Sequence, residues 1–322
     1  MSREEGGYLL DAHPKAEVIT LFSEYIDLRP ITVNNYTGIL KQYERYLKEN
    51  NILKSRRKDV MYFRDSLWTQ GKSPTTVQKY MVVIKQFYKW AKKHQAEFEL
   101  DPAYKIDIAD GIKGAKVEFY YKKEPLAIEQ VHTLLQTAND LRTDIYGYRN
   151  YAIILLMLVT GLRTMEITDA KISDISRIDK KTILYIKGKG SYEKHHFVRL
   201  PEEVVNAISD YLYYRTDKSP YLFVSHQKGV HSLGRDFIGK MVKSLLLKAG
   251  IHSKRITPHS LRHTTAYLNL KHGGTLTATR QLLRHKHITS TMIYADHLDR
   301  LDNDSEERLE HIYFNKEEQT NE

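Results

Sequence analysis

The chain has 322 residues, of which 41% are hydrophobic, so it can bury the core of one large domain or of two ordinary ones. The absence of cysteine excludes disulfides and cysteine-based zinc sites. The net charge of +10 and the pI near 9.3 favour a polyanionic partner, although a solvated basic surface would carry the same charge.

The most apolar stretches indicate neither export nor membrane insertion. Residues 1–14 are polar and acidic and lack the apolar run of a signal peptide, so we interpret them as an N-terminal extension. Residues 151–159 are apolar but far shorter than the roughly 20 residues that a membrane span requires. We therefore expect a cytoplasmic protein with no membrane partner.

Residues 15–100 predict a helical domain. Apolar side chains recur there at three- and four-residue intervals, which is typical of helices that bury one face. Ser73 followed by Pro74 is typical of a helix start, because serine can cap free N–H groups and proline fits the first turn. The four predicted helices lie near residues 18–26, 36–47, 58–68 and 74–91.

Residues 101–124 have weak periodicity, two glycines and mixed charge, so we expect an interdomain linker. Residues 125–298 predict a second domain of helices with a small antiparallel sheet. Residues 182–187 and 195–200 alternate as strands do, and Gly188-Lys189-Gly190-Ser191 between them is typical of a hairpin loop. The expected fold class is therefore mainly α, with a four-helix domain followed by an α+β domain.

Positive charge concentrates in two blocks. Residues 51–93 contain 11 Lys/Arg against 2 Asp/Glu, which predicts a basic surface on the last two helices of the first domain. Residues 126–298 contain 25 against 14, whereas the tail, residues 299–322, contains 3 against 9. This pattern predicts two surfaces that face a polyanion and a terminus that does not.

The strongest local motif is Thr257-Pro258-His259-Ser260-Leu261-Arg262-His263. Thr257 and Pro258 are typical of a helix start, so His259 and Arg262 would share one face of its first turn. The free N–H groups and the helix dipole favour an anion there, and arginine can bind a phosphate at two points. An ordinary helix start with two basic surface residues is an equal alternative.

Three weaker motifs contain further candidates. Arg163 follows the apolar helix that stops at Gly161, where a charge must either face an anion or pair, for example with Glu166. Lys189, at the hairpin tip, could reach a site as a proton donor or remain a solvated loop residue. Leu282-Leu283-Arg284-His285 precedes Tyr294, but with 23 tyrosines in the chain this proximity is weak evidence alone.

In this order, the motifs resemble the tyrosine recombinase (phage integrase) family, close to its Xer and simple integrase branch. The combination is highly specific and covers nearly all of the second domain, while the first looks like the family's core-binding domain. The family usually has glycine at the position of Arg284, where a larger cation would alter the local backbone or add a DNA contact. The matching segments are Gly161–Arg163, Gly188–Gly190, His259–His263, Leu282–His285 and Ser290–His297.

The resemblance implies a covalent mechanism with no metal and no nucleotide cofactor. Tyr294 attacks a DNA phosphate and forms a 3′-phosphotyrosyl link with a free 5′ hydroxyl, so the bond energy is kept for rejoining. Arg163 and Arg262 neutralise charge on the phosphate oxygens as the transition state forms.

The resemblance gives four other residues supporting roles. His259 hydrogen-bonds the phosphate and is a candidate base for Tyr294, since a free tyrosine has a pKa near 10. Lys189 is the implied general acid, and His285 hydrogen-bonds the phosphate. Glu166 would orient the site from behind these groups.

The implied partner is double-stranded DNA with inverted-repeat core sites, held between the two basic domains. The resemblance also implies a homotetramer in the synaptic complex, with a monomer when free as the alternative. The acidic tail carries Leu309, Ile312 and Tyr313 on one side, and we expect it to dock on a neighbouring protomer or to fray. Candidate DNA contacts are Arg56, Arg57, Lys72, Lys79, Lys85, Lys89 and Arg284.

The motifs do not distinguish integration or excision of a mobile element from Xer-type dimer resolution or a DNA inversion switch, and three other functions are alternatives. A type IB topoisomerase shares the chemistry but relaxes DNA without strand exchange. A non-catalytic DNA-binding regulator would not need Tyr294. A metal-dependent hydrolase could use His259 and His263, which have helical ligand spacing, but no HExxH motif or carboxylate set accompanies them.

Overall fold

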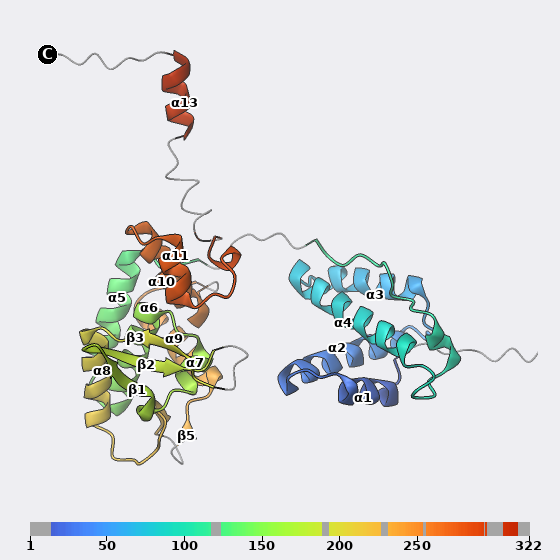
Figure 1. Ribbon diagram of the computed structural model, residues 1–322, viewed down its shortest axis with the longest axis horizontal. Coiled ribbons are helices and arrows are strands. Elements are labelled where there is room, and N and C mark those ends of the chain that lie inside the picture. The colour runs from blue at the N-terminus through green and yellow to red at the C-terminus, as the bar shows by residue number, and fades with distance from the viewer. Residues whose placement is uncertain are drawn as a thin grey trace, which may run out of the picture. The chain divides into compact units, whose positions relative to one another are not determined.

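The computed structural model describes residues 14–116, 124–188, 193–226, 231–253, 256–292, 294 and 305–314. The chain divides into two compact units, Met1–Glu118 and Phe119–Glu322 (Figure 1). No helix of the described residues combines the length and the apolar character needed to cross a membrane.

The N-terminal unit is built on four helices that enclose an aromatic core. The long helix α4 packs against the other three, because all its apolar residues from Val77 to Ala91 except Val82 are buried. Ser73 caps α4 by accepting a hydrogen bond from the backbone N–H of Thr76, and Pro74 is the first helical residue, as predicted. The helices are α1 (Ala16–Tyr25), α2 (Pro30–Glu49), α3 (Arg57–Thr69) and α4 (Pro74–Lys93).

The chain that follows α4 packs on the same core. The short helix η1 (Pro102–Lys105) contacts α4, and Tyr104, Ala109 and Ile112 are buried in the N-terminal cluster. Arg64 on α3 donates a hydrogen bond to the carbonyl oxygen of Lys113 at 3.1 Å. Much of the described part of the expected linker is therefore anchored to the N-terminal unit, while the domain boundaries themselves stay predictions.

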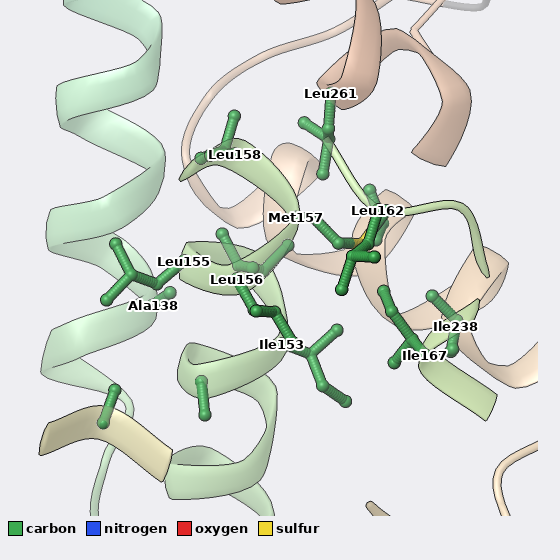
Figure 2. Packing of buried hydrophobic residues seen from close by; sticks show 14 of the residues in the cluster. Ala138, Ile153, Leu155, Leu156, Met157, Leu158, Leu162, Ile167, Ile238 and Leu261 are labelled. Carbon is green, nitrogen blue, oxygen red and sulfur yellow. The ribbon is translucent and has the colours of Figure 1, made fainter. Parts of the chain in front are cut away.

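The apolar helix α6 lies at the centre of the C-terminal unit. Residues Ala152–Leu158 are buried in succession, because α5, α8 and α10 pack around the helix (Figure 2). The helices of this unit are α5 (Ile128–Asp140), α6 (Ile145–Thr160), α7 (Thr164–Thr168), η2 (Ile172–Asp174), α8 (Glu202–Tyr213), α9 (Arg235–Lys248), α10 (Pro258–Lys271), α11 (Leu276–Leu283) and α13 (Ser305–Phe314).

A three-stranded antiparallel sheet in the order β1-β2-β3 lies among these helices. The predicted hairpin pairs β2 with β3 in a register that places Leu184 opposite Val198, and both side chains are buried. The edge strand β1 was not predicted, because its side chains are largely exposed and show no apolar alternation. The strands are β1 (Ile175–Ile178), β2 (Lys181–Ile186) and β3 (His196–Arg199), with a separate pair β4 (Val224–Ser225) and β5 (His231–Ser232).

A glycine ends α6 and turns the chain toward α7. Gly161 has φ +60°, and a Cβ atom there would lie 2.8 Å from Cδ2 of the buried Leu283. Glycine adopts this left-handed conformation without the steric cost that other residues incur. The turn brings Arg163 to the start of α7, next to the ends of α10 and α11.

We predict that Gly161→Ala lowers the free energy of unfolding by about 1–2 kcal/mol, because alanine is strained in the left-handed region. Urea unfolding of the full chain, followed by far-UV circular dichroism, measures the change. Gly239→Ala within α9 is the matched control, since a Cβ there meets nothing within 4 Å and alanine favours helix. Equal stability of the wild type and Gly161→Ala would contradict the prediction.

Candidate active site

Arg262 lies inside the C-terminal unit, in the first turns of α10. Its side chain is 1% exposed, and its guanidinium donates hydrogen bonds to the carbonyl oxygens of Gly161 and Leu283. Burial and the nearby charges of Arg163 and Arg284 lower its pKa to about 9, so it stays positively charged at neutral pH. The sequence placed Arg262 and His259 on one face, but only His259 is exposed.

Arg163 and Glu166 form an ion pair at the start of α7. Nη1 of Arg163 lies 2.7 Å from Oε1 of Glu166, and the backbone N–H of Arg163 donates to Oε2 at 2.8 Å. The side chain of Arg163 remains 29% exposed, whereas that of Glu166 is 4% exposed. The carboxylate therefore holds the guanidinium from the inner side and leaves part of it accessible to a ligand.

Arg284 occupies the left-handed position that ends α11, with φ 55° and ψ 43°. Its side chain turns inward, and Nη2 donates to Oε2 of Glu166 at 3.0 Å while Nη1 donates to the carbonyl oxygen of Leu282 at 2.6 Å. The side chain is 8% exposed, so its charge faces the protein interior. The guanidinium of Arg284, which the sequence suggested as a DNA contact, is therefore not exposed to solvent.

His285 follows Arg284 and is tied to the next helical turn. Its Nδ1 lies 2.8 Å from Oγ1 of the buried Thr291, and the hydroxyl can donate to a neutral imidazole. Burial, followed by the positive charges of Arg262, Arg163, Arg284 and His259, lowers the pKa of His285 to about 4. The imidazole is therefore neutral at physiological pH.

Tyr294 is nearly buried beside this cluster. Its side chain is 4% exposed and packs with Ala266 and Leu283, and its hydroxyl lies 2.5 Å from Nδ1 of His263. The ring of Tyr294 is almost parallel to that of His285, with the centroids 6.5 Å apart. Its hydroxyl is thus bound to an imidazole next to several guanidinium groups.

His263 also belongs to this arrangement, although the sequence suggested it only as a possible metal ligand. It lies one turn after His259 on α10, and the two rings are in edge contact with their centroids 4.4 Å apart. Its position in the motif Thr257–His263 was visible in the sequence, but its contact with Tyr294 joins residues 31 positions apart. Among the described residues, no group of three His, Asp or Glu side chains is arranged to hold a metal ion.

The structure brings five of the six predicted catalytic residues into one electrostatic cluster. The charges of Arg163, Arg262 and His259 all act on His285, and Tyr294 acts on Arg262. Lys189, which falls between β2 and β3 in the sequence, lies outside the described residues.

The candidate DNA contacts of the first domain lie on the N-terminal unit. Arg56 and Arg57 are exposed at the start of α3, and Arg57 also donates a hydrogen bond to the carbonyl oxygen of Asp110. Lys72, Lys79 and Lys89 are exposed before and along α4, and Lys85 is half-buried. The basic side chains therefore lie on the outside of a helix whose other face forms the core.

Comparison with protein families gives two matches along the chain. The model of the phage integrase family matches residues 124–300, and that of the phage integrase N-terminal SAM-like domain matches residues 19–95. The chain is 28% identical over 294 residues to tyrosine recombinase XerD of Staphylococcus epidermidis, covering 85% of this chain and 93% of the relative. It is 28% identical to tyrosine recombinase XerA of Pyrococcus furiosus, covering 87% and 89%.

Solved structures share the fold. A XerH site-specific recombinase bound to a palindromic difH substrate, in a post-cleavage complex, matches with a TM-score of 0.71 and 23% identity over 88% of this chain and 80% of that one. A lambda integrase dimer bound to a COC′ core site matches with a TM-score of 0.66 and 15% identity, covering 86% and 76%.

We predict that His285 makes the protein less stable as the pH falls from about 6.5 to about 4. Its pKa is lowered in the folded state, so the unfolded chain binds the proton first and unfolding is favoured within this window. The stabilisation is complete above the window and lost below it. Urea midpoints at pH 7 and pH 4.5 measure the loss, which should be smaller for His285→Gln; identical pH dependence of the two proteins would contradict the prediction.

Proposed function

The chain belongs to the phage integrase family and is a site-specific tyrosine recombinase that cleaves and rejoins DNA, and we propose that Tyr294 is its nucleophile. One observation carries this assignment: the nearly buried hydroxyl of Tyr294 is bound to an imidazole beside a cluster of guanidinium groups. The family matches favour this function over a type IB topoisomerase or a non-catalytic regulator.

Arg163, whose side chain remains 29% exposed, is proposed to bind the scissile phosphate, and the buried Arg262 to stabilise the charge on that phosphate through its own positive charge. A phosphodiester gains negative charge on its oxygens as the tyrosine attacks, and preorganised cations stabilise that charge. Burial and the carbonyl oxygens of Gly161 and Leu283 hold Arg262 in place, and Glu166 holds Arg163. Neutral His285, whose Nδ1 is bound to Thr291, would donate from Nε2 to a phosphate oxygen, and exposed His259 would add a second such bond.

His263 is proposed to accept the proton of Tyr294 as its oxygen bonds to phosphorus. An ordinary phenol is protonated at neutral pH, so the attack needs a base within hydrogen-bond distance. Nδ1 of His263 lies at that distance, 2.5 Å from the hydroxyl. His263 therefore takes the role for which the sequence suggested His259.

Lys189 is proposed to give a proton to the leaving 5′ oxygen as the phosphorus–oxygen bond breaks, a role that rests on the family resemblance. The product would be a 3′-phosphotyrosyl link and a free 5′ hydroxyl. Because one phosphate ester replaces another, rejoining needs no nucleotide cofactor, and two guanidinium groups take the place of a metal ion.

DNA is the partner of this protein, and inverted-repeat core sites bound by a homotetramer are proposed. The exposed basic residues of α3 and α4 support phosphate contacts. Leu309, Ile312 and Tyr313 on α13 are 45%, 61% and 71% exposed, which supports docking of the acidic tail on a neighbouring protomer. A DNA substrate also supports a cytoplasmic location.

We predict that the protein forms a covalent complex with DNA that withstands denaturant and depends on Tyr294. The full chain is incubated with fragmented genomic DNA of its source organism, and DNA that remains bound in detergent is sequenced. A nicked duplex with the recovered sequence should then trap the complex in EDTA with the wild type but not with Tyr294→Phe.

Tyr185→Phe, in strand β2, is the matched control and should leave the covalent yield unchanged. A covalent complex formed by Tyr294→Phe, or none formed by the wild type, would refute the assignment of the nucleophile. Exchange of strands between two such duplexes separates recombination from simple relaxation.

We predict that His263→Gln slows cleavage of the nicked duplex at pH 7 by about 100-fold or more, the usual contribution of a general base. The loss should shrink as the pH rises to 8.5, where more of the phenol ionises without help. This range lies below the pKa of Arg262, about 9, so the phosphate-binding charge is retained. His259→Gln is the control, since losing a phosphate hydrogen bond gives a loss that does not depend on pH; a pH-independent loss in His263→Gln would rule out the base.

A further inference from the structure

Arg284 has a conformation and an environment that cost stability. Its φ of 55° lies in the left-handed region, where glycine is favoured at the end of a helix. Its guanidinium is buried, and its Nε has no hydrogen-bond partner among the described residues. A residue kept under such strain is a candidate for a functional role.

The contacts of Arg284 all lie at the base of the proposed phosphate site. Nη2 binds Oε2 of Glu166 at 3.0 Å, and Nη1 is 3.3 Å from the carbonyl oxygen of Thr160. The carbonyl oxygen of Gly161, which accepts from Arg262, also lies 3.4 Å from Nη2 of Arg284. Arg284 thus contacts the turn that carries Arg163 and the carboxylate that holds it.

The carboxylate of Glu166 contacts two arginines, Arg163 and Arg284, and each of its two oxygens binds the side chain of one of them. Oε1 binds the side chain of Arg163, while Oε2 binds Arg284 and the backbone N–H of Arg163. Burial raises the pKa of Glu166, but Arg284 and then Arg163 outweigh it, so the pKa is lowered and the carboxylate stays ionised. Without Arg284, this buried negative charge would be opposed at hydrogen-bond distance by Arg163 alone.

The charge of the site then depends on Arg284. Arg163, Arg262 and Arg284 against Glu166 give a net charge of +2, and without Arg284 it would be +1. A phosphodiester carries one negative charge, and a second develops on its oxygens as a nucleophile adds. A site of +2 therefore matches the transition state better than the ground state, which is the condition for faster chemistry.

Building on the proposed function, we propose that Arg284 is a positioning residue for strand cleavage: it takes up the charge of Glu166 so that Arg163 stays available to the scissile phosphate. Arg284 itself does not touch DNA. Arg284 acts through Glu166, so its effect should disappear when Glu166 is neutralised, whereas the effect of a direct phosphate contact would not.

The test is a double-mutant cycle on the nicked duplex recovered by covalent capture, with cleavage measured in single turnover at saturating DNA. Arg284→Gln should slow cleavage by about 10- to 100-fold, the range expected for a lost charge-assisted hydrogen bond. The dissociation constant of the duplex should change less than about twofold, because Arg284 itself touches no phosphate and most of the binding comes from the other phosphates of the duplex. Glu166→Gln with Arg284→Gln should regain most of the lost rate, since no carboxylate then competes for Arg163.

Three results would overturn the proposal: wild-type cleavage by Arg284→Gln, a double variant no faster than Arg284→Gln, or weaker binding with a salt slope reduced by about one, as a lost phosphate contact gives. Arg284→Gly covers a failure of the glutamine variant to fold, because glycine relieves the backbone strain while removing the same charge, and it should show the same loss of rate. Covalent capture by the wild type is scored first, so a failed nucleophile assignment is distinguished from a failed role of Arg284.

Discussion

The bond between the buried guanidinium of Arg262 and the carbonyl oxygens of Gly161 and Leu283 organises the catalytic unit. The last carbonyl groups of a helix have no hydrogen-bond partner within that helix. Here the carbonyl groups at the ends of α6 and α11 accept hydrogen bonds from a side chain of a third helix, α10. Removing the guanidinium would leave the buried carbonyl oxygen of Leu283 unpaired, which is costly, and that of Gly161 with only its 3.4 Å contact to Arg284. The residue whose charge is proposed to stabilise the phosphate is therefore also the one that joins three helices.

A cluster of cations beside this bond is stable only because the protein compensates for their repulsion. Glu166 lies between Arg163 and Arg284, and backbone carbonyl oxygens accept hydrogen bonds from Nη1 of Arg284 and from both Nη atoms of Arg262. Burial, followed by the repulsion of neighbouring cations, lowers the pKa of Arg262 to about 9 and that of His285 to about 4. An anionic ligand would relieve the repulsion, which supports the proposal that this site binds phosphate.

On helix α4 of the N-terminal unit, the residues that form the core and those proposed to bind DNA lie on opposite faces. The inner face of α4 carries the aromatic core, in which Phe22, Phe87 and Trp90 contact one another edge-on or tilted. Its outer face carries exposed lysines that contribute little to that core. The proposed DNA-binding residues on such a face can change without a loss of stability, whereas at the proposed catalytic site Arg262 would serve both stability and binding.

Local spacing in the sequence was sufficient to predict the four helices of the first domain and the β2–β3 hairpin, and to single out the motifs around Arg163, His259 and Tyr294. Periodicity and helix caps depend on residues a few positions apart, so the chain itself encodes them. Only the tertiary structure decided that Arg262 is buried, that Arg284 reaches Glu166 across 118 positions, and that His263 binds Tyr294. These contacts depend on how α6, α10 and α11 pack, and local spacing carries no information about which distant side chain will complete a hydrogen bond.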